Sequence, residues 1–105
     1  MIKTKSAKKA KQKVEVYIFR LYVADNEQNS QIARENLKNV CDEYLKGRCK
    51  IEEIDILKDY AAAMEEKVFI TPTLILAAPG PRASVVGNLK DKEKVVAALR
   101  LRNRT

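Results

Sequence analysis

Apolar and polar positions alternate along the chain in two periods, one typical of strands and the other of helices. Residues 14–23, VEVYIFRLYV, carry apolar side chains on both faces of an extended segment, which predicts a central strand covered on both sides. From Ser30 to Leu45 the apolar residues recur every three or four positions, which predicts an amphipathic helix. Asn29 or Ser30 is its expected N-cap, and Gly47 is expected to end it.

A second strand and a short helix follow in the middle of the chain. Residues 49–57 predict a strand that is half-buried through Ile54 and Ile56. Residues 58–69 predict a helix, favoured by three consecutive alanines. A strand, a helix and another strand over this length form a βαβ unit, in which the two strands run parallel.

The last third of the chain predicts a hairpin and a closing helix. Residues 73–78 and 82–87 are strands joined by Pro79-Gly80-Pro81, an order of proline and glycine that matches a type II turn. Residues 91–102 predict a helix with an aspartate at its N-cap. The sequence shows no repeat and no second domain, so the predicted architecture is one α/β domain in the order βαβαββα.

This order is similar to the thioredoxin-like fold, whose hallmark is a cis-proline that opens the third strand. Pro72 occupies the matching place, so the resemblance predicts a cis peptide bond before it. In redox members of that fold a C-x-x-C pair follows the first strand, but residues 24–30 read ADNEQNS and hold no thiol. Cys41 and Cys49 are too far apart in sequence to form such a pair.

Charge is distributed unevenly over the 105 residues, whose formal net charge is +7. Of the 21 basic residues, six are lysines within residues 1–13, which leaves 15 basic against 14 acidic residues in the remainder. We therefore expect residues 1–13 to be a basic disordered leader and residues 14–105 to be the folded domain. Such a leader can bind nucleic acid, but no aromatic residue lies among its lysines to stack on bases, so nucleic acid is not the expected partner.

Several other classes of protein are disfavoured by composition. No apolar run approaches the roughly 20 residues that span a bilayer, and the N-terminal stretch lacks the apolar segment of a secretory signal. The chain has no histidine, and two distant cysteines cannot close a zinc site, so we expect no metal and no cofactor. Two cysteines also make no disulfide framework, which predicts a reduced, cytoplasmic protein.

Four sequence motifs give a closer resemblance. In order they read LYVADNEQNSQIARENLKNV, IDILKD, TPTLI and VVGNLKDKEKV. Together they resemble the KaiB family, small regulators of the cyanobacterial clock and its relatives, in which motifs of this kind occur in the same order and at nearly the same spacing. The match covers about residues 14–101, and it identifies the chain as a divergent member.

The resemblance implies a non-enzymatic regulator that binds a KaiC-type ATPase, in clock-like timing or in stress or metabolic signalling. It also implies a KaiA-like or SasA-like component and a homo-oligomer, dimer or tetramer, as further partners. KaiB-family proteins switch between a tetramer with a distinct C-terminal half and a thioredoxin-like monomer that binds KaiC. Lys58 and Lys67 match the family at the surface presented to KaiC and are the expected partner-binding residues.

The chain departs from the family pattern at positions that bear on both binding and folding. Ile32, Glu52 and Ser84 stand where relatives often carry basic residues. Where relatives commonly read GLDL, this chain has Ala98 and Arg100 in place of Gly and Asp. Alanine favours a helix over glycine by about 1 kcal/mol, and a basic side chain suits a helix C-terminus. We therefore predict that the thioredoxin-like state is the resting state.

Two alternative functions follow from the residues. A thioredoxin-superfamily redox protein that uses one cysteine requires an accessible thiol of low pKa near Pro72. A nucleic-acid-binding module led by the lysine-rich leader requires binding that weakens steeply with salt and is lost when residues 1–13 are deleted.

Overall fold

The computed structural model describes residues 15–24 and 27–101. The predicted leader, residues 1–13, lies outside the described residues, as do Val14 and Asp25. The elements follow the predicted order βαβαββα: β1 (Tyr17–Val23), α2 (Gln28–Leu45), β2 (Cys49–Asp55), α3 (Tyr60–Glu65), β3 (Thr73–Ala78), β4 (Ala83–Val86) and α4 (Lys92–Leu99).

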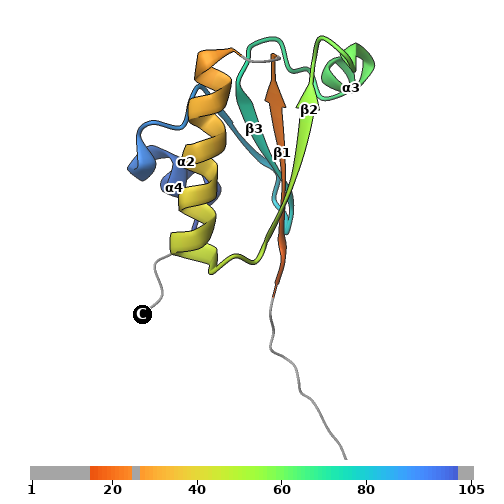
Figure 1. Ribbon diagram of the computed structural model, residues 1–105. Coiled ribbons are helices and arrows are strands. Elements are labelled where there is room, and N and C mark those ends of the chain that lie inside the picture. Colours follow the sequence, from red (N-terminus) through yellow and green to blue (C-terminus); the bar gives the residue numbers. More distant parts are fainter. Residues whose placement is uncertain (1–14, 25–26, 102–105) are drawn as a thin grey trace, which may run out of the picture.

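The four strands form one sheet in the order β2-β1-β3-β4. β1 pairs with β2 in parallel and with β3 antiparallel, and β3 and β4 form an antiparallel hairpin. The apolar segment β1 is thus central, as its sequence predicts. Helices α2 and α4 lie on one side of the sheet, and α3 lies on the other, beside the end of β2 (Figure 1).

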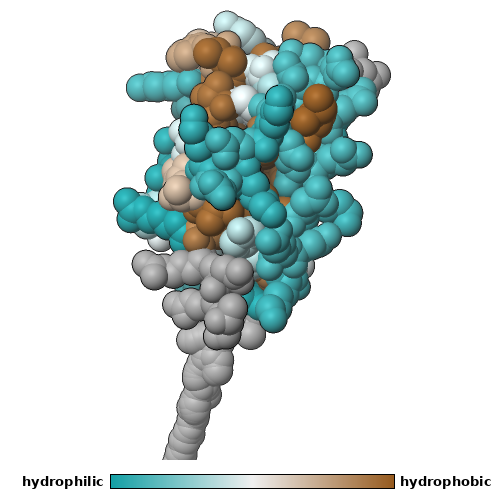
Figure 2. All heavy atoms as spheres, turned by 90° about the vertical axis from the view of Figure 1, so that its left-hand side faces the viewer, coloured by the Kyte–Doolittle hydropathy of each residue, from teal (hydrophilic) through white to brown (hydrophobic). Residues whose placement is uncertain are grey.

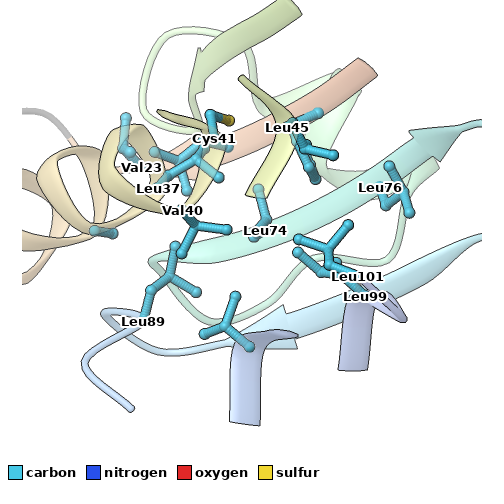
Figure 3. Close-up of a cluster of buried hydrophobic side chains, with 14 residues drawn as sticks. Val23, Leu37, Val40, Cys41, Leu45, Leu74, Leu76, Leu89, Leu99 and Leu101 are labelled. Carbon is cyan, nitrogen blue, oxygen red and sulfur yellow. The ribbon is translucent and has the colours of Figure 1, made fainter. Parts of the chain in front are cut away.

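The main core fills the space between the sheet and helices α2 and α4 (Figure 3). The amphipathic stripe of α2 supplies Leu37, Val40 and Cys41, which are among the inward-facing residues that its periodicity predicts. Ala33 and Leu45 also come from α2. The rest of the cluster comes from the sheet, from α4 and from the residues flanking that helix: Phe19, Leu21, Val23, Leu74, Leu76, Leu89, Val95, Leu99 and Leu101. The outer surface on this side is mostly hydrophilic, with a narrow band of hydrophobic side chains showing between the polar ones (Figure 2).

A smaller core lies on the opposite side of the sheet. Tyr22 and Ile75 pack there against Ala63 of α3 and against Val68, which follows the helix. Short helix α3 covers only part of this face, so its apolar contacts are few.

The N-terminus of α2 differs from the prediction. The helix begins at Gln28, and no side chain caps it. Ser30 is instead fully buried inside the first turn, where its hydroxyl accepts a hydrogen bond from the Ala24 N–H (3.3 Å) and donates one to the Glu27 carboxylate (3.1 Å). This serine therefore ties the helix to the end of β1 and does not cap it.

The two segments that flank β3 gave one confirmed and one wrong prediction. The Thr71–Pro72 bond is cis, as predicted. The Pro79-Gly80-Pro81 segment joins the two strands but is not a type II turn, because the peptide bonds before both prolines are cis and Gly80 lacks the positive φ that this turn requires.

Several elements are shorter than predicted. β1 begins at Tyr17, β2 ends at Asp55, and α3 spans only six residues instead of 58–69. The last helix is capped as predicted, because the Asp91 carboxylate accepts from the Lys94 N–H at 3.3 Å. It ends at Leu99, since the next residue adopts a left-handed conformation.

Candidate docking surface

A tight turn after β2 places the first predicted binding residue. The Asp55 carboxylate accepts a hydrogen bond from the Leu57 N–H (2.9 Å). Its backbone carbonyl accepts from the N–H groups of Lys58 (3.0 Å) and Asp59 (2.8 Å). Three hydrogen bonds to one residue thus fix the backbone of Lys58, whose side chain is exposed.

Helix α3 has a defined start and a defined stop. The Asp59 carboxylate accepts from the Ala62 N–H at 3.1 Å and caps the helix, which offsets an unpaired backbone donor. At the other end Lys67 adopts a left-handed φ of 59°, and the Val68 N–H donates to the Ala63 carbonyl at 2.9 Å. The two predicted lysines therefore flank α3, one at each end, as the sequence indicates.

Large apolar side chains lie exposed around these lysines. Leu57, Tyr60 and Phe69 are 70%, 68% and 72% exposed, and Met64 and Ile70 are exposed as well. Monomeric proteins rarely leave such residues clustered in water, and a cluster of this kind marks an interaction site. We call this set the α3 surface: Leu57, Lys58, Tyr60, Met64, Lys67, Phe69 and Ile70.

A groove continues the α3 surface onto strand β4. Its volume is about 180 Å³, and its lining includes Lys67, Phe69, Ile70, Ser84 and Val86. Val86 is also exposed. The groove is thus lined both by apolar side chains and by charged and hydroxyl groups.

A cluster of ion pairs borders the same face of the sheet. Arg20 Nε lies 3.2 Å from a Glu52 carboxylate oxygen, and Arg20 Nη1 lies 3.7 Å from Glu66. Glu66 also forms an ion pair with Arg82, whose Nη2 lies 2.8 Å from Glu66 Oε1. The hydrogen bond that Arg20 donates to Glu52 raises the pKa of Arg20, while burial and the nearby Glu66 carboxylate raise the pKa of Tyr22. These pairs connect the C-terminal end of α3 to β1, β2 and the start of β4.

The three departures from the family pattern occupy different places. Ile32 is half-buried in α2, on the other side of the sheet. Glu52 and Ser84 lie in one row across the sheet, because the strand register aligns Glu52 with Arg20, Arg20 with Ile75, and Ile75 with Ser84. Two of the three changes therefore alter the face that carries the α3 surface.

The cysteines do not meet the requirement for a thiol enzyme. Cys49 aligns with Tyr17 at the start of β1, whereas Pro72 precedes the residue that aligns with Tyr22 near the end of that strand. The thiols and the cis-proline thus lie at opposite ends of the sheet. Burial raises the pKa of both thiols, which disfavours the reactive thiolate.

Sequence reasoning located the lysines but missed much of their surroundings. Phe69 and Ile70 lie at or beyond the end of the predicted helix, and in the structure they follow α3. Their position directly before Thr71-Pro72 was the only sequence feature that could have indicated a loop there. The Arg20–Glu66–Arg82 connections join distant segments, and no local pattern indicates them. Within residues 15–24 and 27–101 no cluster of potential ligands could hold a metal ion. None of the helices described there is long and apolar enough to cross a membrane.

The fold and the site together define a thioredoxin-like domain that has an exposed helical surface in place of a redox pair. The N-terminal domain of SasA from Synechococcus elongatus has the same fold, with a TM-score of 0.67, 19% identity, and coverage of 90% of this chain and 93% of that domain. Deadhead, a germline-specific thioredoxin from Drosophila melanogaster, matches with a TM-score of 0.64 and 20% identity over 82% of this chain and 80% of its own. The predicted fold class is therefore confirmed.

Sequence comparison gives the family. The KaiB domain model matches residues 20–101. The circadian clock oscillator protein KaiB of Microcystis aeruginosa is 41% identical over 85 residues, which cover 81% of this chain and 82% of that relative. The chain belongs to the KaiB family.

Proposed function

We propose that this protein is a non-enzymatic regulator that binds a KaiC-type ATPase through the α3 surface. The observation that carries the proposal is the grouping of five exposed apolar side chains around two lysines on one turn–helix–turn segment. The membership of the KaiB family supports the choice of partner.

The chemistry of the surface fits a protein partner. Exposed aromatic and aliphatic side chains such as Tyr60 and Phe69 gain most when a partner removes them from water, and aromatic anchors dominate many interfaces. Lys58 and Lys67 stand at the edge of this apolar area, where they pair with carboxylates of an acidic partner face and guide its approach. The proposed complex thus has an apolar centre and a basic rim.

The same proposal places the protein in the cytoplasm, where such an ATPase works. A KaiA-like or SasA-like component competes for or joins the complex, and self-association into dimers or tetramers withdraws the chain from it. The pathway is either clock-like timing or stress or metabolic signalling, and the two differ in the output of the ATPase and not in the docking chemistry.

The test is sedimentation of the full chain with the KaiC-type ATPase of its own genome, in ATP and in ADP. We expect a complex whose amount depends on the nucleotide. Lys58→Glu with Lys67→Glu should weaken binding at least about tenfold, because two favourable charge contacts become repulsive.

A matched control keeps the net charge equal. Lys90→Glu with Lys94→Glu makes the same charge change at exposed positions near the start of α4, away from the α3 surface. Normal binding by this control and weak binding by the first pair would support the proposal. Equal binding by both pairs would place the interface elsewhere, and a folded chain that forms no complex in either nucleotide would overturn the choice of partner.

A further inference from the structure

The fold brings the two cysteines together although eight positions separate them in sequence. Cys41 lies in the last part of α2, and Cys49 is the first residue of β2. Between them the chain turns back on itself: the Gly47 N–H donates to the Cys41 carbonyl at 3.2 Å, and the Cys49 N–H donates to the Gly47 carbonyl at 2.8 Å. Lys46 and Gly47 both adopt positive φ, which makes this reversal possible.

The two thiol groups meet at the edge of the main core. They lie within hydrogen-bonding reach of each other. Cys41 is buried in the main core, and half-buried Cys49 packs against it (Figure 3 shows Cys41). The neighbouring Arg48 carries a buried Nε that has no hydrogen-bond partner in the described part of the chain, and its positive charge favours the thiolate form of Cys49.

We propose that Cys41 and Cys49 form a redox-modification site, which a hydroperoxide converts into an intramolecular disulfide. The site is distinct from the α3 surface, because Cys49 opens β2 whereas α3 follows the other end of that strand. The inference therefore stands independently of the proposed function. A disulfide carries no charge and needs no hydrogen bond, so it suits this apolar place at least as well as two thiols.

The reaction with hydrogen peroxide proceeds in two balanced steps. The more accessible Cys49 loses its proton and attacks one peroxide oxygen; the O–O bond breaks, hydroxide leaves and takes up that proton as water, and Cys49 becomes a sulfenic acid. Cys41 Sγ then attacks the Cys49 sulfur; the S–S bond forms, and the displaced hydroxide leaves with the Cys41 proton as a second water. Two thiols lose two electrons in total, and one peroxide gains them.

The surroundings of the thiols determine how the reaction depends on pH. Burial raises the pKa of both cysteines, and the Asp42 carboxylate raises it further. At Cys49 the hydrogen bond with Cys41 and the charge of Arg48 oppose these effects without cancelling them. The thiolate is therefore scarce near neutrality. We expect oxidation to be slower than that of free cysteine at about pH 7 and to accelerate roughly tenfold for each unit of pH up to the pKa of Cys49.

The experiment uses the full chain, fully reduced and then exposed to hydrogen peroxide at about pH 8, where some thiolate is present. Thiols are counted in denaturant, and the intact mass is measured. We expect both thiols to disappear, no covalent dimer to form, and the mass to fall by two hydrogen atoms. Trypsin should then release residues 39–46 joined to residues 49–50, a pair that separates on reduction.

Two single variants provide the matched controls. In Cys41→Ala and in Cys49→Ser the remaining thiol has no partner, so the product should be an oxygenated cysteine or a disulfide-linked dimer. Added oxygen or dimers in the unaltered chain, or two thiols that stay free throughout, would overturn the proposal. The joined peptides in the unaltered chain alone would establish the site.

Discussion

The two faces of the sheet are built for different purposes. On one face, a core of fourteen buried side chains lies between helices α2 and α4 and the central strands β1 and β3. On the other, six-residue α3 covers four buried side chains and leaves Leu57, Tyr60 and Phe69 largely in water. The same kinds of residue thus hold the fold together on one side and remain available for binding on the other.

The two faces differ because α2 has many apolar residues on its inward side and α3 has few. Each turn of α2 after the first supplies an inward apolar side chain, whereas α3 buries only Ala63. A small buried residue lets the helix lie close to the sheet but gains little from burial, since the hydrophobic contribution grows with apolar area. The position of α3 depends correspondingly more on its cap and on ion pairs such as Glu66 with Arg82.

Core truncation should produce the largest effect and test this contrast most severely. Leu37→Ala in α2 should lower the free energy of unfolding by about 2–5 kcal/mol, because it leaves a cavity at a fully buried site. Val68→Ala on the α3 side should cost less, since that side chain lies at the edge of a small cluster. Urea unfolding of both variants measures the difference, and equal losses would contradict the contrast.

Alkaline pH should destabilise the protein through buried groups on both faces. Burial raises the pKa of Cys41 on one side and of Tyr22 on the other. Both groups thus stay protonated in the folded chain after they ionise in the unfolded one, so their stabilising contribution is complete below their ordinary pKa and is lost as pH rises above it. For Cys41 the loss should reach about 2 kcal/mol near pH 10.5.

Single variants assign that alkaline loss to one face or the other. Cys41→Ala should flatten the decline in the free energy of unfolding that begins near pH 9, and Tyr22→Phe should flatten the part above about pH 10. Urea titrations across this range provide the measurement. A decline that neither variant changes would show that other groups control it.

Two substitutions at the end of α4 should change the free energy of unfolding by smaller amounts and in opposite directions. Ala98 is an exposed position within α4, so Ala98→Gly should destabilise the thioredoxin-like state by about 1 kcal/mol. Arg100 follows the helix with a left-handed φ of 57°, where glycine is favoured. Arg100→Gly should therefore stabilise the state by up to about 1 kcal/mol, which means that Arg100 favours it less than its charge alone suggests.

These two variants also test the predicted resting state. A sizing column should show the unaltered chain as a monomer and Ala98→Gly with more of any tetramer. Spectra that place residues 91–102 in a strand in the resting protein would contradict the prediction.

Most of the fold could be predicted from the sequence, because the patterns that indicate it are local and repeated. The apolar stripe of α2, the two-sided apolar β1 and the cap at Asp91 each act within a few residues of their own position. Element ends were less predictable, since they depend on tertiary partners. Ser30 reads as an N-cap in sequence, but the Ala24 N–H and the Glu27 carboxylate engage it inside the helix.

The candidate site was predictable only in part for the same reason. Lys58 and Lys67 were found through a family resemblance, and their flanking positions are a local property of α3. The exposure of Phe69 and Ile70 depends on how little of the sheet α3 covers, and the approach of Cys41 to Cys49 depends on the reversal at Lys46 and Gly47. Such features require the folded arrangement.

The most direct test of the central claim removes apolar area from the α3 surface and leaves its charge unchanged. Phe69→Ser with Ile70→Ser should leave the free energy of unfolding within about 0.5 kcal/mol, because both side chains are exposed. Titration of this pair with the KaiC-type ATPase should show affinity at least about tenfold weaker than that of the unaltered chain. Val16→Ser with Ile51→Ser, which alters two exposed apolar residues away from α3, should bind normally. Unchanged affinity for the Phe69 and Ile70 pair would contradict the assignment of the α3 surface as the docking site.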